Sequence, residues 1–164
     1  MNSPTNSDRN ETDGSTVSVE TIRRSPCASG FEMLTCETIV VRREDDHVQV
    51  ILTRPAARNA MNQKMVQELS QVFSLIEQQV ELQKTASEVV GKGIRALVIS
   101  GAGNHFCAGG DVLDLAQAFQ EKNEQALSQL NREFGAMLMQ LQQLPVVVIA
   151  LLQGATMGGG LGLV

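Results

Sequence analysis

Two glycine-rich segments contain the residues of this sequence that could do chemistry. They are Gly101–Asp111 (GAGNHFCAGGD) and Gln153–Gly160 (QGATMGGG). A chain needs glycine where φ is positive or where a ligand must approach the backbone closely. Each segment follows a short apolar run and precedes an expected helix, and free N–H groups at a helix start favour negative charge. We therefore expect both segments to present backbone donors to an anionic group.

Three kinds of site use such loops, and the flanking residues discriminate between them. A dinucleotide-binding loop needs G-x-G-x-x-G, but Gly101–Phe106 supplies only the first two glycines. A phosphate-binding P-loop ends in G-K-[ST], which neither segment contains. An oxyanion hole needs N–H donors and no particular side chain. The sequence therefore favours an oxyanion hole with one donor from each segment.

Composition indicates a soluble globular chain and argues against several partners. The 164 residues are 43% hydrophobic and 19% charged, and the net charge is −5 without a Lys/Arg cluster. We therefore expect neither nucleic acid nor a membrane as a partner. The longest apolar run, Pro145–Leu152, is too short to span a bilayer. The 3 cysteines form neither a disulfide framework nor a CxxC metal site, so we expect no metal and a cytoplasmic location.

Four apolar or β-branched runs predict the strands that position these loops. Thr38–Arg42 and His47–Thr53 are separated by a charged turn, which predicts a hairpin. Ile94–Ser100 and Val146–Leu151 are short apolar runs, which predict two buried strands. Each of the latter two runs leads directly into a glycine-rich segment.

Apolar residues spaced by three and four predict two long helices. One is capped by Asn62 and runs to about Leu82, and the other runs from about Glu124 to Leu144. A third helix is expected to begin at Leu161–Val164. Alternating strands and helices indicate an α/β fold, in which ligands bind beyond the carboxyl ends of the strands.

The two ends of the sequence differ from the middle. Residues 1–32 are rich in Ser, Thr, Asn and Asp and are expected to be a disordered leader, with the folded domain at 33–164 and Met33 as a candidate start. The sequence stops within an expected apolar helix start, so we expect a fragment that lacks its C-terminal helices.

Three blocks of the sequence resemble successive blocks of the crotonase superfamily, the enoyl-CoA hydratase/isomerase family. They are Leu52–Asn62 (LTRPAARNAMN), Val98–Asp111 (VISGAGNHFCAGGD) and Pro145–Gly162 (PVVVIALLQGATMGGGLG). The resemblance covers residues 37–164, with Gln83–Gly93 slightly longer than the family usually shows. It implies an incomplete crotonase-like spiral of ββα units, assembled as a homotrimer or hexamer. The implied substrate is an acyl-CoA thioester, so coenzyme A is part of the substrate and no separate cofactor is implied.

The resemblance also implies which residues contact the substrate. The backbone N–H groups of Ala108 and Gly159 are expected to donate to the thioester oxygen. The backbone of Ala108–Asp111 is expected to line the CoA channel, and the Arg58–Ala60 loop to lie near the adenine. The implied substrate-binding residues are Arg58, Asn59, Ala60, Ala108, Gly109, Gly110, Asp111, Gly158 and Gly159.

One position departs from the family pattern. Hydratases of the family usually carry Glu where this sequence has Gly162, and a second Glu normally follows beyond Val164. The chain therefore holds neither proton-moving carboxylate and is expected to be inactive alone. The ending Gly160–Val164 resembles the methylglutaconyl-CoA hydratase-like branch. We expect hydration of an enoyl-CoA, with isomerisation, decarboxylation or a non-catalytic pseudoenzyme as alternatives.

Four side chains near the loops also have plain structural explanations. His105 is expected to contact solvent, and Asp111 to cap a short helix. Cys107 has no evident His or Asn partner, so a small buried residue is expected rather than a nucleophile. Arg58 is expected on a loop, with contact to a CoA phosphate as the second option.

Overall fold

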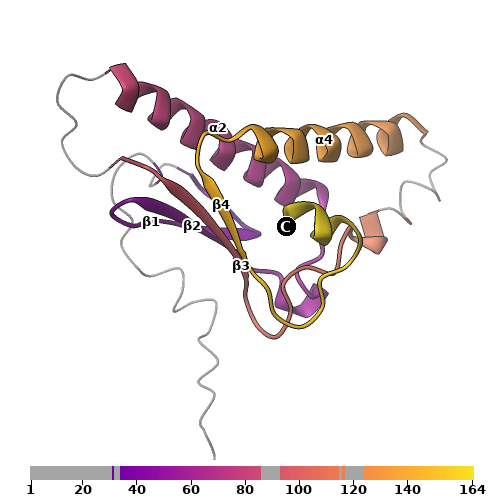
Figure 1. Cartoon of the computed structure of the whole chain (residues 1–164). Coiled ribbons are helices and arrows are strands. Elements are labelled where there is room, and N and C mark those ends of the chain that lie inside the picture. Colours follow the sequence, from indigo (N-terminus) through magenta and orange to yellow (C-terminus); the bar gives the residue numbers. More distant parts are fainter. Residues whose placement is uncertain (1–30, 32–33, 86–92, 115, 117–123) are drawn as a thin grey trace, which may run out of the picture.

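The computed structural model describes residues 31, 34–85, 93–114, 116 and 124–164 (Figure 1). The predicted disordered leader lies outside these residues, except for Phe31, which is buried. Residues 86–92, within the long Gln83–Gly93 stretch, also lie outside them. The order of elements alternates strands and helices as predicted.

Four strands form one mixed sheet. They are β1 (Ile39–Arg43), β2 (His47–Leu52), β3 (Ala96–Gly101) and β4 (Val147–Leu151), in the order β1-β2-β3-β4. The β1–β2 hairpin is antiparallel, whereas β2–β3 and β3–β4 are parallel. The predicted hairpin and both later strands are therefore confirmed, with ends shifted by one or two residues. The segments that follow β2, β3 and β4 meet at one end of the sheet.

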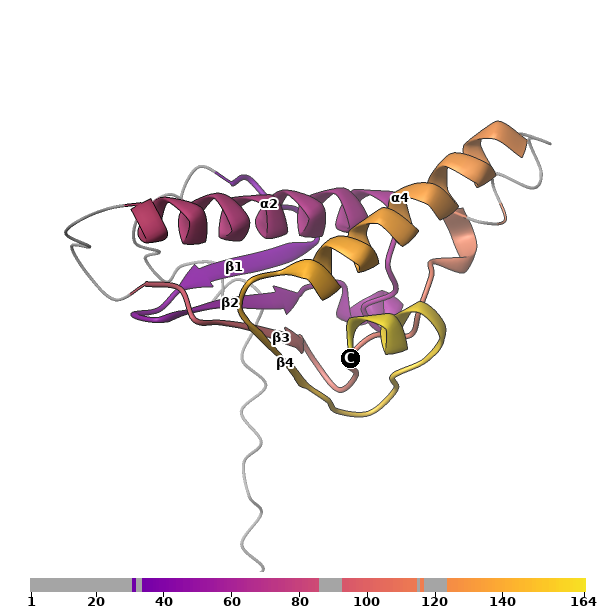
Figure 2. The same cartoon turned by 45° about the horizontal axis from the view of Figure 1, so that its top comes forward.

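Two helices cover one face of this sheet (Figures 1 and 2). They are α2 (Gln63–Thr85) and α4 (Glu124–Gln143). The side-chain oxygen of Asn62 accepts a hydrogen bond from the Met65 N–H at 3.0 Å, so the predicted cap is confirmed. Helix α4 ends at Gln143, two residues before Pro145, which cannot continue a helix.

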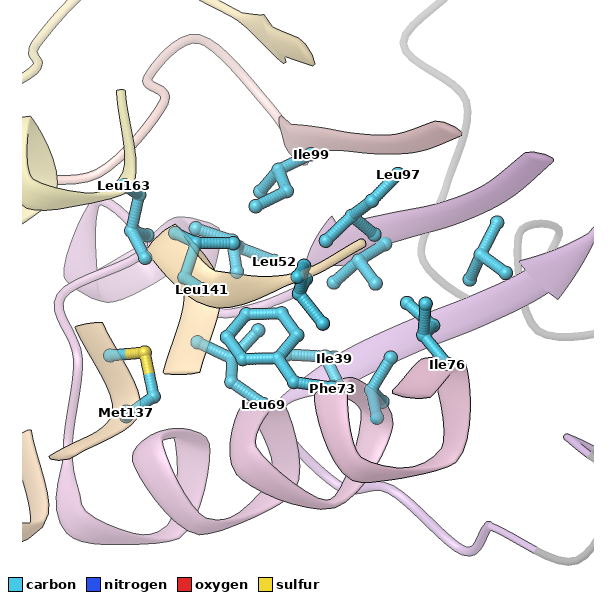
Figure 3. Close-up of a cluster of buried hydrophobic side chains, with 14 of the residues drawn as sticks. Ile39, Leu52, Leu69, Phe73, Ile76, Leu97, Ile99, Met137, Leu141 and Leu163 are labelled. Atoms are coloured by element: carbon cyan, nitrogen blue, oxygen red, sulfur yellow. The ribbon is translucent and has the colours of Figure 1, made fainter. Parts of the chain in front are cut away.

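The core lies between the two helices and the inner face of the sheet (Figure 3). Every residue predicted on the apolar stripe of α2 is buried: Met65, Val66, Leu69, Val72, Phe73, Ile76 and Val80. Of the residues predicted on the apolar stripe of α4, only Met137 and Leu141 are buried; the others are Leu127, Leu130, Phe134 and Leu138. A short 3-10 helix, η2 (Pro55–Ala57), and a second one, η3 (Gly158–Leu163), flank the loops.

The structure corrects two predictions near the end of the sequence. Strand β4 is not buried on both sides, because Val147, Ile149 and Leu151 are 63%, 42% and 48% exposed. A continuous apolar run is typical of a strand in a sheet that is covered on both faces. In this structure the described helices cover only one face of the sheet. The expected helix start at residues 161–164 is instead η3, which begins at Gly158.

Candidate active site

Three loop segments lie side by side beyond the ends of β2, β3 and β4. On one side, the Met61 N–H donates to the Gly109 carbonyl at 2.7 Å, and the Asp111 N–H donates to the Met61 carbonyl at 2.9 Å. On the other side, the Met157 N–H donates to the Cys107 carbonyl at 3.0 Å. The glycine loop after β3 is therefore the middle of three paired segments, at the edge where α/β folds bind ligands.

Close approach between the loops explains two of the glycines. Gly109 has a φ of 100°, and a Cβ there would lie 2.8 Å from the Met157 carbonyl oxygen and 3.3 Å from the Gly159 nitrogen. A Cβ at Gly160 would lie 2.5 Å from the Cys107 carbonyl oxygen. Real Cβ atoms do not tolerate such contacts with backbone, so these glycines let the two loops pack together.

The expected donor Ala108 is already engaged. Its N–H donates to the Arg58 carbonyl at 3.0 Å, so it points toward the loop after β2. Two residues further along, Gly110 forms a parallel bridge with Met61 through the flanking Gly109 carbonyl and Asp111 N–H. In such a bridge the middle residue's own N–H points away from its partner segment. The Gly110 N–H is therefore directed away from Met61.

Gly110 and Gly159 are the two glycines that share a pocket. Among the residues that the structure describes, neither N–H donates a backbone hydrogen bond outside the regular elements. Gly159 is in the first turn of η3, where N–H groups have no partner within the helix. The pocket has a volume of about 180 Å³ and is lined by Met61, Val66, Gly110, Asp111, Leu130, Asn131, Phe134 and Gly159.

Asp111 is both a cap and half of an ion pair. Its Oδ1 accepts a hydrogen bond from the Leu113 N–H at 3.0 Å, so the predicted cap is confirmed. Its Oδ2 lies 2.7 Å from a guanidinium nitrogen of Arg54, and its side chain is 7% exposed. Arg54 was not among the site residues predicted from the sequence. Both oxygens of this carboxylate are therefore engaged by the protein itself.

Asn59 and Arg58 were expected to contact the substrate. In the structure they join the loop after β2 to the loop after β3. The Asn59 side chain is buried, and its Nδ2 donates to the carbonyls of Ala102 and His105 at 3.0 and 2.7 Å. Arg58 is exposed and in the left-handed region at φ 50°, and its carbonyl accepts the Ala108 N–H. None of the residues Arg58, Asn59, Ala60, Ala108, Gly109 and Gly158 lines the pocket.

His105 and Cys107 also have structural positions. The Nδ1 of His105 accepts a hydrogen bond from the Ala155 N–H at 3.0 Å, so this residue joins two loops rather than merely contacting solvent. Gln153 supports the same junction, because its Nε2 donates to the carbonyls of Gly101 and Gly103 at 2.7 and 3.0 Å. Cys107 is buried as predicted, and burial raises the pKa of its thiol, which disfavours the nucleophilic thiolate.

The pocket holds a single carboxylate among the described residues that line it, the ion-paired Asp111. Gly162, where the family resemblance led us to look for Glu, faces α4. A Cβ built there would lie 2.8 Å from the Leu138 Cδ1. Within the described residues, no group of three or more His, Cys, Asp or Glu side chains is placed to hold a metal ion. None of the described helices has the length and apolarity needed to cross a bilayer.

Comparisons with known proteins match this chain over most of its length. A family model described as enoyl-CoA hydratase/isomerase matches residues 48–164. The chain is 32% identical over 136 residues to the mitochondrial Delta(3,5)-Delta(2,4)-dienoyl-CoA isomerase of Mus musculus, covering 78% of this chain and 38% of the relative. It is 28% identical over 114 residues to the enoyl-CoA isomerase/hydratase fer4 of Mycosarcoma maydis, covering 70% of this chain and 39% of that relative.

Solved structures of enoyl-CoA hydratase/isomerase proteins also superpose on this chain. An enoyl-CoA hydratase/isomerase from Marinobacter aquaeolei superposes with a TM-score of 0.66 at 42% identity, covering 78% of this chain and 46% of that chain. Pseudomonas aeruginosa AtuE superposes with a TM-score of 0.67 at 38% identity, covering 77% and 44%. The chain therefore spans less than half the length of these relatives and structures.

Proposed function

Because the chain belongs to the enoyl-CoA hydratase/isomerase family, we propose that it binds an acyl-CoA thioester and polarises the thioester carbonyl with two backbone N–H groups. The donors in this proposal are Gly110 and Gly159. Gly110 replaces the expected Ala108, because the Ala108 N–H is bonded to the Arg58 carbonyl.

The observation that carries the proposal is the pairing of these two glycines in one pocket. Both line it, and neither N–H is used in a hydrogen bond between the loops. Gly110 is exposed and Gly159 is partly exposed, so a ligand oxygen that enters the pocket could accept from both N–H groups. Each such donor contributes about 3–4 kcal/mol when negative charge develops on the oxygen.

The preferred reaction is addition of water to an enoyl-CoA. When hydroxide adds to the β-carbon, the electron pair of the double bond moves through the α-carbon onto the thioester oxygen. The N–H groups of Gly110 and Gly159 would stabilise that enolate until a proton returns to the α-carbon. Asp111 is unsuited to move protons because Arg54 and the Leu113 N–H engage its two oxygens. The proton-moving carboxylate therefore lies outside the described pocket in this proposal.

Double-bond isomerisation is the second candidate. It is favoured by the 32% identity to the mouse dienoyl-CoA isomerase. Isomerisation passes through a related enolate or dienolate, so the same pair of donors would serve it. The expected homotrimer or hexamer remains part of the proposal for the whole protein, and sedimentation velocity is the measurement that decides it.

Infrared spectroscopy of bound crotonyl-CoA tests the two donors without requiring turnover. With a ¹³C-labelled thioester carbonyl, we expect the stretch to move to lower frequency on binding, since hydrogen bonds weaken the C=O bond. Gly159→Ala should abolish the shift, because its Cβ would lie 2.7 Å from the Phe134 Cζ and disturb the site. The matched control is Gly135→Ala on α4, whose Cβ meets nothing within 4 Å. Binding without any carbonyl shift would contradict the proposal.

Enzyme assays then separate the two reactions. Hydration of crotonyl-CoA removes the absorbance of the conjugated thioester, whereas isomerisation of a 3-enoyl-CoA creates it. Assays of crotonyl-CoA, 3-methylglutaconyl-CoA and a 3-enoyl-CoA therefore distinguish hydratase from isomerase. Acyl-CoA binding with a carbonyl shift but no turnover would support the expectation that this chain is inactive alone.

A further inference from the structure

The pocket beside Gly159 is narrowed by one aromatic side chain. A Cβ built at Gly159 would lie 2.7 Å from the Phe134 Cζ and 3.1 Å from the Met61 Cε. The ring therefore packs directly against the Gly159 backbone, next to one of the proposed donors. An acyl group whose thioester oxygen is held by Gly110 and Gly159 would meet Phe134 within its first carbons.

The volume of the pocket limits what can fit beside this ring. It measures about 180 Å³. A cavity of about 150 Å³ holds one benzene molecule, which has six carbons. Four of the lining residues, Met61, Val66, Leu130 and Phe134, present apolar side chains, so the pocket favours a hydrocarbon group.

Of the apolar residues that line the pocket, Phe134 is one that could be shortened without exposing the core. Met61 and Val66 are 4% and 2% exposed and belong to the buried cluster, whereas Phe134 packs against that cluster and is only partly buried. It projects from α4, a separate element from the loops that carry the donors. Shortening its side chain would therefore enlarge the pocket while leaving Gly110 and Gly159 in place.

We propose that the pocket accepts a short acyl group of about four to six carbons and that Phe134 sets this limit. The proposal rests on the proposed function, since it takes the group beside Gly159 to be the acyl part of a CoA thioester. Phe134 is in this view a specificity-determining residue, and its effect is on which acyl chain binds rather than on the chemistry.

Calorimetric titration of the whole chain with free CoA, butyryl-CoA and octanoyl-CoA tests the limit. In an open groove, each added methylene strengthens binding, so octanoyl-CoA would bind tighter than butyryl-CoA. We expect no such gain, so octanoyl-CoA should bind no tighter than butyryl-CoA, because the carbons beyond the pocket stay in water. Phe134→Ala should let octanoyl-CoA bind roughly tenfold tighter than butyryl-CoA, and Phe134→Leu should give an intermediate ratio while disturbing packing less.

Met139→Ala is the matched control, because Met139 is on the same helix and is 61% exposed. It should leave the ratio of the two affinities unchanged. Tighter binding of octanoyl-CoA by the unaltered chain, or an unchanged ratio in both Phe134 variants, would overturn the chain-length proposal and leave acyl-CoA binding intact. Acyl-CoA affinity no higher than that of free CoA would instead overturn the proposed function.

Discussion

At the residue scale, one buried amide joins three parts of the candidate site. Asn59 donates to the carbonyls of Ala102 and His105 and accepts the Arg54 N–H at 2.9 Å. It has a φ of 55°, a region that Asn tolerates better than most residues. The loops after β2 and β3 therefore depend on a side chain that the family resemblance had led us to expect at the substrate.

Replacing Asn59 should destabilise the chain, because its side chain holds three backbone groups. Asn59→Ala would bury three polar groups without partners, and we expect the free energy of unfolding to fall by about 3 kcal/mol. Urea unfolding measures this. Asn59→Gly should lose slightly less, because glycine accepts the positive φ. Gln153→Ala, which removes two bonds from a more exposed side chain, should cost about 1 kcal/mol. If Asn59→Ala lost less stability than Gln153→Ala, the role of Asn59 in joining the loops would be contradicted.

The pH dependence of Cys36 gives a second prediction at this scale. Burial, followed by the nearby Glu68 carboxylate, raises the pKa of the Cys36 thiol from 9.0 to about 11, with Lys64 opposing. The folded chain therefore keeps this proton where the unfolded chain loses it. The resulting stabilisation is complete below pH 9 and is lost as pH rises toward about 11.

Urea midpoints measured across that pH range should fall with rising pH, and Cys36→Ser should fall less steeply. Some slope should remain in that variant, because the pKa of the Cys107 thiol is also raised by burial. Alkylation of Cys36, followed by peptide mass spectrometry, should be slow at pH 9 and accelerate toward pH 11. Equal alkylation rates in folded and urea-unfolded chain at pH 9 would refute the raised pKa.

The choice between Ala108 and Gly110 shows the limit of sequence reasoning for single residues. The glycine content predicted a loop that packs closely against other backbone, as Gly109 does against the Met157 carbonyl, because positive φ and close approach require that residue type. Which N–H stays free depends on pairing with Met61 and Arg58, residues on a different loop. No local pattern in Gly101–Asp111 indicates that pairing, so the sequence predicted the glycine loop but not that the Ala108 N–H is bonded to Arg58.

At the element scale, α2 was predictable and α4 only partly so. All seven predicted positions on α2 are buried, because they pack in the core cluster with residues of the strands. The C-terminal half of α4 packs near the sheet, whereas its N-terminal half extends past it (Figure 2). Leu130 and Phe134, on the same apolar stripe, therefore line the pocket, and Phe134 is only partly buried against the core. Periodicity identifies an apolar face but not what that face contacts.

Gly135 supplies a stability prediction for α4. It lies inside the helix, where glycine costs about 0.5–1 kcal/mol relative to alanine. A Cβ there meets no atom within 4 Å, so Gly135→Ala should raise the free energy of unfolding by up to about 1 kcal/mol. Thermal unfolding checks the direction. Gly162→Ala should show no such gain, because its Cβ would lie 2.8 Å from the Leu138 Cδ1. A lower melting temperature for Gly135→Ala would contradict the conclusion that a Cβ fits at this position without a clash.

At the scale of the whole molecule, alternating strands and helices predicted the α/β class, and the crotonase-like fold is confirmed by the solved structures that superpose on the chain. The hairpin followed by two parallel crossovers agrees with the predicted order of elements. The sequence could not show that one face of β4 is left uncovered. An apolar strand has the same composition whether a neighbouring layer is present or absent.

The uncovered face of β4 gives the last prediction, which concerns association. Val147, Ile149 and Leu151 alternate along the strand and share its exposed face. No charged residue occurs from Leu144 to Val164, so no edge lysine or glutamate opposes pairing there. We therefore expect the chain to self-associate increasingly with concentration, as exposed apolar strands do.

Ile149→Lys should suppress this association, because a lysine in the middle of the face would have to be desolvated in any contact. Size-exclusion chromatography with light scattering over a range of concentrations measures the effect. Met139→Lys adds the same charge to an exposed position on α4, away from β4, and should change the elution much less. If both lysine variants act equally, net charge rather than the β4 face controls association. If the unaltered chain is a monodisperse monomer throughout, the exposed face of β4 is too small to drive association by itself.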